Sequence, residues 1–232
     1  MLALNKDKSL LIFSVGKTGS TSIQRVLDNS WLTLGEERPL YSEWITDSHI
    51  DDQHRYLTQY EMVDELTAIY NPQITCIIRE PWKRFVSGMK EVIQDYCFHL
   101  YKEDQFLENW NRIMDDDELC KDIINGLYYL SEFETNKTYQ ETVFDWHRSF
   151  AIFHNYHTKN WLHKVVGLPD SKIITVENLD DYITSLGFTP TRENVSNKRD
   201  IKTVESALKK SNVYHLIEKY LEPEIKLFKS IT

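Results

Sequence analysis

Three short apolar runs, separated by segments with helical spacing, limit the folds open to this chain more than any other feature. The runs cover residues 9–15, 73–78 and 172–176, and each is rich in β-branched or aliphatic residues. Helical periodicity extends over about 54–70, 82–94, 138–157 and 178–186. Because strands that alternate with helices favour a parallel sheet, we expect an α/β fold with a P-loop-like parallel β-sheet flanked by helices.

The length of the chain favours a single domain over residues 1–232, since 232 residues can bury one sizeable core. The segment 96–137 is polar, acidic and aromatic, and we expect it to add helices and loops over one edge of that core. The acidic run 115–118 within it predicts a solvated face. Gly187 predicts the end of the helix over 178–186, and apolar residues at helical spacing after Thr203 predict closing helices.

Composition excludes several functional classes. The net charge of -9 argues against broad nucleic-acid binding, which needs a basic face. No stretch approaches the roughly 20 apolar residues of a membrane helix, and the N-terminal residues lack a signal-peptide pattern, so we expect a cytoplasmic protein. The three cysteines, Cys76, Cys97 and Cys120, are widely spaced and indicate a reducing compartment.

The first apolar run leads directly into the glycine-containing segment 16–23, GKTGSTSI, with a helix expected to start near Ser20. Gly16 and Gly19 permit a tight turn, Lys17 adds a positive charge, and successive backbone N–H groups face one anion in such loops. An ordinary strand-to-helix turn with a capping serine is the alternative interpretation. We expect a phosphate or phosphosulfate group to be bound by Gly16, Lys17, Thr18, Gly19, Ser20, Thr21 and Ser22.

The loop differs from the Walker A pattern of nucleotide triphosphatases. That pattern requires a glycine five residues before the glycine of its Gly-Lys pair, and Leu11 occupies this position here. The lysine therefore comes early in the loop and not at its end.

A second motif follows the second apolar run. Arg79 stands at the expected carboxyl end of that strand, and Pro81 suits the first turn of a helix that carries Ser87. Ligands of open α/β sheets bind outside the carboxyl ends of strands, which predicts Arg79 at the same edge as the glycine loop. A kinase commonly has an aspartate here to hold magnesium. The arginine therefore implies that protein cations meet the ligand's charge, and no metal is expected.

In these two motifs the chain resembles the sulfotransferases that use 3′-phosphoadenosine 5′-phosphosulfate (PAPS). Their phosphosulfate loop has the pattern K-[ST]-G-[ST]-[ST], and Lys17 to Thr21 match it. Their 3′-phosphate motif has the pattern R-x-P-x-x-R-x-x-S, which Arg79, Pro81, Arg84 and Ser87 match. The proline form of the second motif looks more like the carbohydrate-modifying branch of the family.

The resemblance implies transfer of a sulfuryl group from PAPS to a hydroxyl or amine of a small-molecule or carbohydrate acceptor, leaving 3′-phosphoadenosine 5′-phosphate (PAP). It places Lys17 beside the oxygen that leaves with the 5′-phosphate, and Arg79 and Ser87 at the 3′-phosphate. Family members take a histidine or glutamate between the two motifs as general base. We favour His49 for this role, with Glu43 as the alternative and Asp47 and His54 behind them.

Two further segments resemble the family more weakly. Glu177-Asn178-Leu179 is similar to a strand-end turn found late in these enzymes, although a turn capped by Asn178 explains it equally well. The polar segment that includes Lys198 and Arg199 resembles the loop that closes over the nucleotide, or is a solvated surface loop. Ser22 stands where cytosolic members often carry a tryptophan that stacks on adenine, which leaves adenine recognition open.

Two other functions compete with sulfuryl transfer. A small P-loop kinase would use Lys17 on ATP and Glu177 near magnesium, and a non-catalytic module would bind PAP without turnover. Zinc binding is suggested by His147, His154, His157 and His163, but aromatic neighbours favour a packed helix there, and we expect no metal. No pattern in the sequence sets the oligomeric state.

Overall fold

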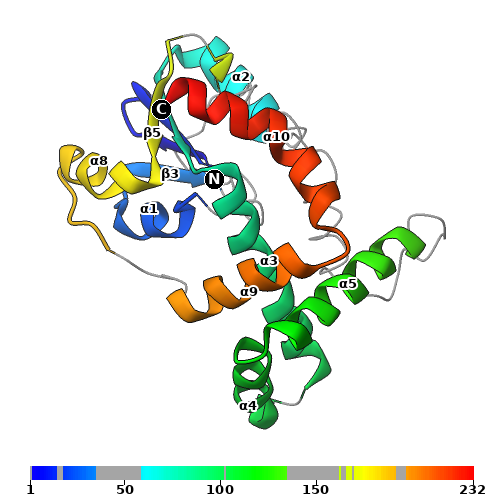
Figure 1. The fold of residues 1–232 in the computed structure, drawn as a ribbon. Coiled ribbons are helices and arrows are strands. Elements are labelled where there is room, and N and C mark those ends of the chain that lie inside the picture. Colours follow the sequence, from blue (N-terminus) through cyan, green and yellow to red (C-terminus); the bar gives the residue numbers. More distant parts are fainter. Residues whose placement is uncertain are drawn as a thin grey trace. The chain divides into compact units, whose positions relative to one another are not determined.

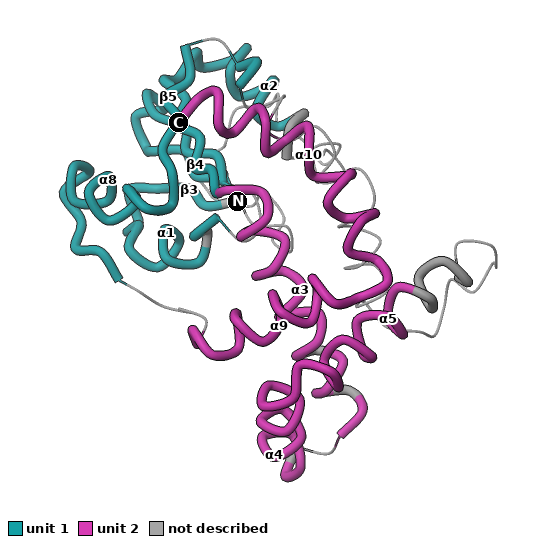
Figure 2. Tube along the Cα trace, viewed as in Figure 1, with its two compact units in different colours: residues 1–79, 165–194 teal, residues 80–164, 195–232 magenta. Residues whose placement is uncertain are grey.

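The structure is a computed structural model, described here for residues 2–14, 18–34, 59–101, 103–134, 162, 166–168, 170–191 and 197–232. Two compact units divide the chain (Figure 2). The first unit contains Met1–Arg79 and Val165–Asn194, and the second contains Glu80–Lys164 and Val195–Thr232. The expectation of a single domain over 1–232 is not tested by this division and stays a prediction.

The described strands form one five-stranded sheet in the first unit, in the order β3-β1-β2-β4-β5. The two outer strands, β3 and β5, are labelled in Figure 1. β2 pairs parallel with β4, and β4 pairs parallel with β5, whereas β1 pairs antiparallel with both β2 and β3. The three predicted strands and the α/β class are confirmed. The three predicted strands pair parallel, but the sheet as a whole is mixed, and the P-loop-like arrangement stays a prediction. The strands are β1 (Leu2–Asn5), β2 (Leu10–Ser14), β3 (Trp31–Leu34), β4 (Gln73–Ile78) and β5 (Lys172–Thr175).

A tight turn at the start of the chain causes the antiparallel pairing. The Lys8 backbone N–H donates to the Asn5 carbonyl at 2.9 Å, and Lys8 adopts a left-handed φ of 62°. The Asn5 side chain accepts from the Leu10 N–H at 2.8 Å, and the Asp7 carboxylate accepts from the Ser9 hydroxyl at 2.7 Å. Asparagine and aspartate stabilise turns by such local hydrogen bonds, so the chain folds back and β1 lies beside β2.

Two helices of the first unit share a hydrophobic core with one face of the sheet. These are α1 (Ser20–Val26) and α8 (Leu179–Ser185), which follows the short 3-10 helix η2 (Val176–Asn178). The buried members of this core come from three strands and both helices: Ala3, Ile12, Ile23, Ile77, Leu179, Tyr182 and Ile183. Neighbouring strand residues such as Leu11 and Phe13 alternate to the other face and are also buried. β2 is therefore a buried central strand.

Gly187 ends α8 as the sequence predicts. Its φ is 87°, its N–H donates to the Thr184 carbonyl at 2.9 Å, and the Phe188 N–H donates to the Ile183 carbonyl at 3.2 Å. This pair of bonds is the Schellman arrangement, which favours glycine because the residue adopts a left-handed conformation. The first unit also contains α2 (Gln59–Tyr70), which lies within the predicted helix over 54–70.

The second unit is helical in its described part. Its core joins residues of five helices, among them Met89, Cys120, Val204, Ala207 and Ile217. The closing helices after Thr203 and the helices within 96–137 are confirmed, whereas the helix predicted over 138–157 lies outside the described residues. The five helices are α3 (Pro81–Leu100), α4 (Glu103–Met114), α5 (Asp117–Glu134), α9 (Lys198–Lys210) and α10 (Tyr214–Ile231).

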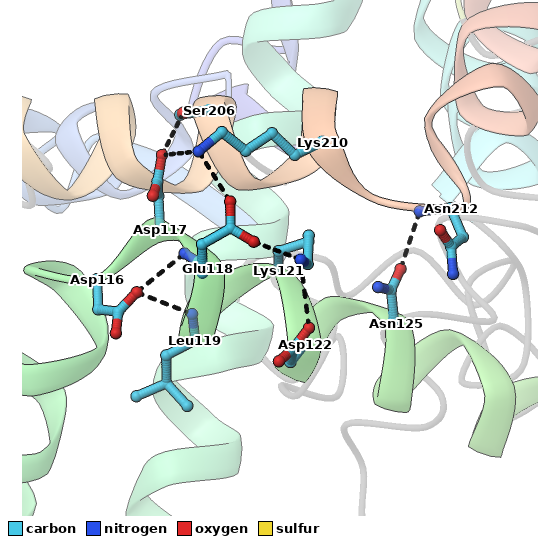
Figure 3. Close-up of polar contacts among 10 residues, drawn as sticks. All are labelled: Asp116, Asp117, Glu118, Leu119, Lys121, Asp122, Asn125, Ser206, Lys210 and Asn212. Carbon is cyan, nitrogen blue, oxygen red and sulfur yellow. Dashed lines mark hydrogen bonds and ion pairs between the residues drawn. The ribbon is translucent and has the colours of Figure 1, made fainter.

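Three residues of the acidic run 115–118 lie at the start of α5, where Asp116 caps the helix and Asp117 and Glu118 pair with lysines (Figure 3). The Asp116 carboxylate accepts from the N–H groups of Glu118 and Leu119 at 3.0 and 3.1 Å. Asp117 accepts from the Lys210 ammonium at 2.8 Å and from the Ser206 hydroxyl at 2.7 Å. The hydrogen bond from Lys210, followed by that from Ser206, lowers the pKa of Asp117. The run is largely exposed, as expected, and its hydrogen bonds also connect α5 to α9.

None of the helices in the described ranges combines the length and apolar character needed to cross a lipid bilayer.

Candidate functional site at the carboxyl edge of the sheet

The parallel pairing of β2 and β4 brings the two sequence motifs to one edge of the sheet. Ser14, the last residue of β2, lies opposite Ile77, and Arg79 follows two residues later. Thr175 at the end of β5 lies opposite Ile78, so Glu177 also follows a strand that ends at this edge. The glycine loop after β2 and Arg79 after β4 therefore leave the sheet from neighbouring strands in the same direction.

In the strand order, the chain moves from β2 and from β4 toward opposite ends of the sheet. From β2 it continues through α1 to β3, the outer strand at one end, whereas the next described strand after β4 is β5, the outer strand at the other end. Open α/β sheets bind ligands outside the carboxyl ends of their strands, at the point where the strand order reverses in this way. The topology thus marks the ends of β2 and β4 as the candidate site.

Gly19 adopts a conformation that favours glycine. Its φ is 81° and its ψ is 15°, and it is the residue immediately before α1. A Cβ atom at this position would lie 2.6 Å from Cδ2 of Leu179, which is buried at the start of α8. The glycine of the loop therefore packs directly against the Glu177-Asn178-Leu179 turn. Gly16 and Lys17 lie outside the described residues, and their roles stay predictions.

Replacing Gly19 with alanine should lower the free energy of unfolding, measured by urea denaturation, by about 2 kcal/mol or more. A left-handed conformation costs an L-residue roughly 1–2 kcal/mol, and the contact with Leu179 adds to this cost. Gly187→Ala is the matched control, because Gly187 has a φ of 87° but no neighbour within 4 Å of the added Cβ. An equal loss in both variants would contradict a role for the Leu179 contact.

The hydroxyl residues of the loop differ in their exposure. Thr18 is completely buried, and its hydroxyl lies 2.7 Å from that of Ser14. Thr18 as a whole has no exposed surface, although the sequence suggested it as a ligand contact, so its contact with a ligand stays a prediction. Thr21 and Ser22 are partly exposed on α1, and Ser20 is its first residue. α1 has only seven residues, so its dipole is small and adds little to the anion binding that the sequence predicts for this loop.

The second motif has the local structure that the sequence predicts. Arg79 is partly buried after β4, and Pro81 is the first residue of α3. The Glu80 carboxylate caps α3 by accepting from the Lys83 N–H at 2.7 Å. Arg84 and Ser87 are buried in α3, with 5% and 9% of their surfaces exposed. Both belong to the second unit. Of this motif, only Arg79 belongs to the first unit, which also contains the glycine loop.

Arg199, a predicted nucleotide contact, has structural partners within the second unit. Its guanidinium donates to Asp115 at 3.1 Å, to Asn111 at 3.0 Å and to Asp200 at 3.1 Å. These bonds attach the first turn of α9 to the end of α4. Lys198 is exposed at the start of α9. Nucleotide binding by Lys198 and Arg199 stays a prediction.

Two of the remaining candidate residues, Glu177 and Asn178, belong to the described part of the chain. Glu177 is exposed in η2, and Asn178 precedes α8 without a capping hydrogen bond from its side chain. The candidate bases and the four histidines considered for zinc lie outside the described residues: Glu43, Asp47, His49, His54, His147, His154, His157 and His163. Within the described ranges, no three His, Cys, Asp or Glu side chains gather into a metal site.

The cysteines are unsuited to nucleophilic chemistry. Cys76, Cys97 and Cys120 are unbridged and buried. Desolvation raises the pKa of each thiol to about 12. The thiolate is the reactive form of cysteine, so these side chains stay protonated and inert near neutral pH.

Comparison with models of protein families, with curated proteins and with solved structures gives no match for this chain.

Proposed function

We propose that this chain is a PAPS-dependent sulfotransferase that transfers a sulfuryl group to a hydroxyl or amine of an acceptor, with a carbohydrate as the preferred class. One observation supports the proposal above all others. The loop that matches the phosphosulfate pattern and the arginine that begins the 3′-phosphate pattern follow neighbouring parallel strands, β2 and β4. Neighbouring strands lie only about 4.8 Å apart, which suits two anionic groups of one nucleotide.

The charges of the motifs suit the two ends of PAPS. Lys17 and the N–H groups of the glycine loop would hold the 5′-phosphosulfate, and the Arg79 guanidinium would bind the 3′-phosphate through charge-assisted hydrogen bonds. Ser87 and Arg84 enter the proposal through the resemblance alone. PAPS is the donor substrate, and transfer from it requires no metal.

The proposed reaction is an in-line displacement at sulfur. The acceptor oxygen or nitrogen forms a bond to sulfur, and the bond between sulfur and the 5′-phosphate oxygen breaks, so the electron pair leaves with PAP. The acceptor proton passes to a general base, for which His49 is the first candidate and Glu43 the second. Lys17 stabilises the charge that develops on the leaving phosphate, and such preorganised donors are worth roughly 3 kcal/mol.

A nucleotide kinase is the second candidate, and one observation favours it. Glu177 is exposed just after the carboxyl end of β5, and the glycine loop likewise follows the carboxyl end of β2. A carboxylate in this place suits a magnesium ion bound to ATP phosphates. The two functions therefore differ in their requirement for magnesium.

Sulfuryl transfer should occur in the presence of EDTA. The experiment follows sulfur-labelled PAPS with a panel of carbohydrates, phenols and amines, beside phosphorus-labelled ATP with magnesium on the same panel. We expect label on an acceptor from PAPS alone. Transfer from ATP only in the presence of magnesium would replace the proposal with the kinase. PAP binding without transfer to any acceptor would leave a non-catalytic nucleotide-binding module.

A further inference from the structure

Two buried hydroxyl groups join the end of β2 to the glycine loop. Ser14 is the last residue of β2 and Thr18 follows four residues later, and neither has any exposed surface. Their Oγ and Oγ1 atoms lie 2.7 Å apart, the usual distance of a hydroxyl–hydroxyl hydrogen bond. A buried hydroxyl is costly unless it is hydrogen-bonded, so each residue stabilises the buried position of the other.

This hydrogen bond connects two residues that are each held by the core of the first unit. Ser14 is held by the parallel ladder with β4, in which it lies opposite Ile77. Thr18 directly precedes Gly19, which packs against Leu179 at the start of α8. Both ends of the short segment that contains Lys17 are therefore fixed to the core of the first unit.

Complete burial also separates Thr18 from the other hydroxyl residues of the loop. A ligand cannot reach a side chain that has no exposed surface, whereas Thr21 and Ser22 are partly exposed. The Thr18 hydroxyl is therefore suited to holding the loop in place and not to binding the ligand.

We infer that Ser14 and Thr18 are positioning residues, whose hydrogen bond, the hydroxyl latch, holds Thr18, Gly19 and the start of α1 against the end of β2. The inference rests on the proposed function, since the latch acts by positioning these residues for the 5′ end of the nucleotide. Without the latch, Thr18 and Gly19 are held less firmly, and the apparent affinity for nucleotide falls with the fraction of molecules that are competent to bind.

Thr18→Val removes the hydroxyl while conserving the shape of the side chain, and it should weaken PAP binding about tenfold in calorimetry. Ser14→Ala should have a similar effect, because it breaks the same bond. Thr18→Ser retains a hydroxyl and should stay within about twofold of the unmodified protein. The double variant Ser14→Ala/Thr18→Val should lose less PAP affinity than the sum of the two single losses, because both substitutions remove the hydrogen bond that the two hydroxyls share.

Thr75→Val is the matched control. Thr75 lies in β4 with 1% of its surface exposed, so its substitution also removes a buried hydroxyl from the first unit, away from the loop. We expect Thr75→Val to bind PAP within about twofold of the unmodified protein, even if urea denaturation shows that this variant has a lower free energy of unfolding. This comparison separates a change in the loop from a general loss of stability.

The outcomes distinguish the latch from the proposed function. If the unmodified chain binds PAP and Thr18→Val binds it equally well, or no more weakly than Thr75→Val, the latch is overturned and the proposed function stands. Failure of Thr18→Ser to restore binding would also overturn it. An unmodified chain that is folded but does not bind PAP would overturn both.

Discussion

Replacing Lys17 with alanine should lower kcat for sulfuryl transfer about 100- to 1,000-fold, while PAP affinity changes less than about tenfold. The reason is that the leaving 5′-phosphate gains negative charge only as the bond to sulfur breaks. A preorganised donor at that oxygen stabilises the transition state more than the bound nucleotide, and removing one such donor typically costs this factor. Substitution of Lys17 should therefore act on turnover and much less on binding.

Steady-state kinetics with PAPS and calorimetry with PAP measure the two effects separately. Lys6→Ala is the control, because Lys6 is an exposed lysine in the turn between β1 and β2. This variant should keep both kcat and PAP affinity. Equal losses of turnover and of PAP affinity in Lys17→Ala would show that the lysine only binds the nucleotide, and its catalytic role would be wrong.

Replacing Arg79 with alanine should abolish the preference for PAP over AMP. Hydrogen bonds to charged groups contribute about 1.5–3 kcal/mol, so the unmodified chain should bind PAP roughly 10- to 150-fold more tightly than AMP. AMP lacks the 3′-phosphate, and the loss of Arg79 should therefore weaken PAP binding and leave AMP binding nearly unchanged. Arg79→Lys should recover part of the preference, because a lysine keeps the charge but loses the bidentate geometry.

Calorimetric titration of both nucleotides into each variant tests this prediction. Arg25 provides the control: it belongs to the same unit, and it lies in the last turn of α1, at the opposite end from the glycine loop. Arg25→Ala should retain the full preference for PAP. Arg79 has no part in recognising the 3′-phosphate if the variant without it still binds PAP far more tightly than AMP.

The sequence was sufficient to predict the part of the fold that builds the candidate site. The apolar runs that become β2 and β4 are short, continuous and bounded by polar residues, which is typical of strands buried on both faces. The run that becomes β5 has the same pattern, although its residues are at most partly buried. Pro81 and Gly187 mark a helix start and a helix end through backbone constraints that act locally. Local signals of this kind also placed Arg79 at the carboxyl end of its strand.

The two antiparallel strands were missed for a local reason. They lie outside the three apolar runs, and Asn5, Lys6, Asp7 and Lys8 form the turn that joins β1 to β2. β1 and β3 contain four residues each, too few for a clear alternation of apolar and polar positions. A turn interpretation of Asn5 and Asp7 would have predicted the hairpin.

The contacts that support the glycine loop depend on the tertiary fold. Leu179 is 160 positions from Gly19 in the chain, and only the packing of α8 against α1 brings them together. Ser14 gave a weak signal, as a polar residue at the end of an apolar run, but its partner Thr18 resembled an ordinary loop hydroxyl. Arg199 likewise suggested a ligand contact, although its charge is met by Asp115 and Asp200.

A crystal structure of the chain with bound PAP tests the proposed site most directly. We predict one nucleotide at the carboxyl edge of the sheet, with its 5′-phosphate against residues 16–22 and its 3′-phosphate hydrogen-bonded to the Arg79 guanidinium. A nucleotide bound elsewhere, or an Arg79 guanidinium that contacts no phosphate of a nucleotide held by the loop, would contradict the proposal.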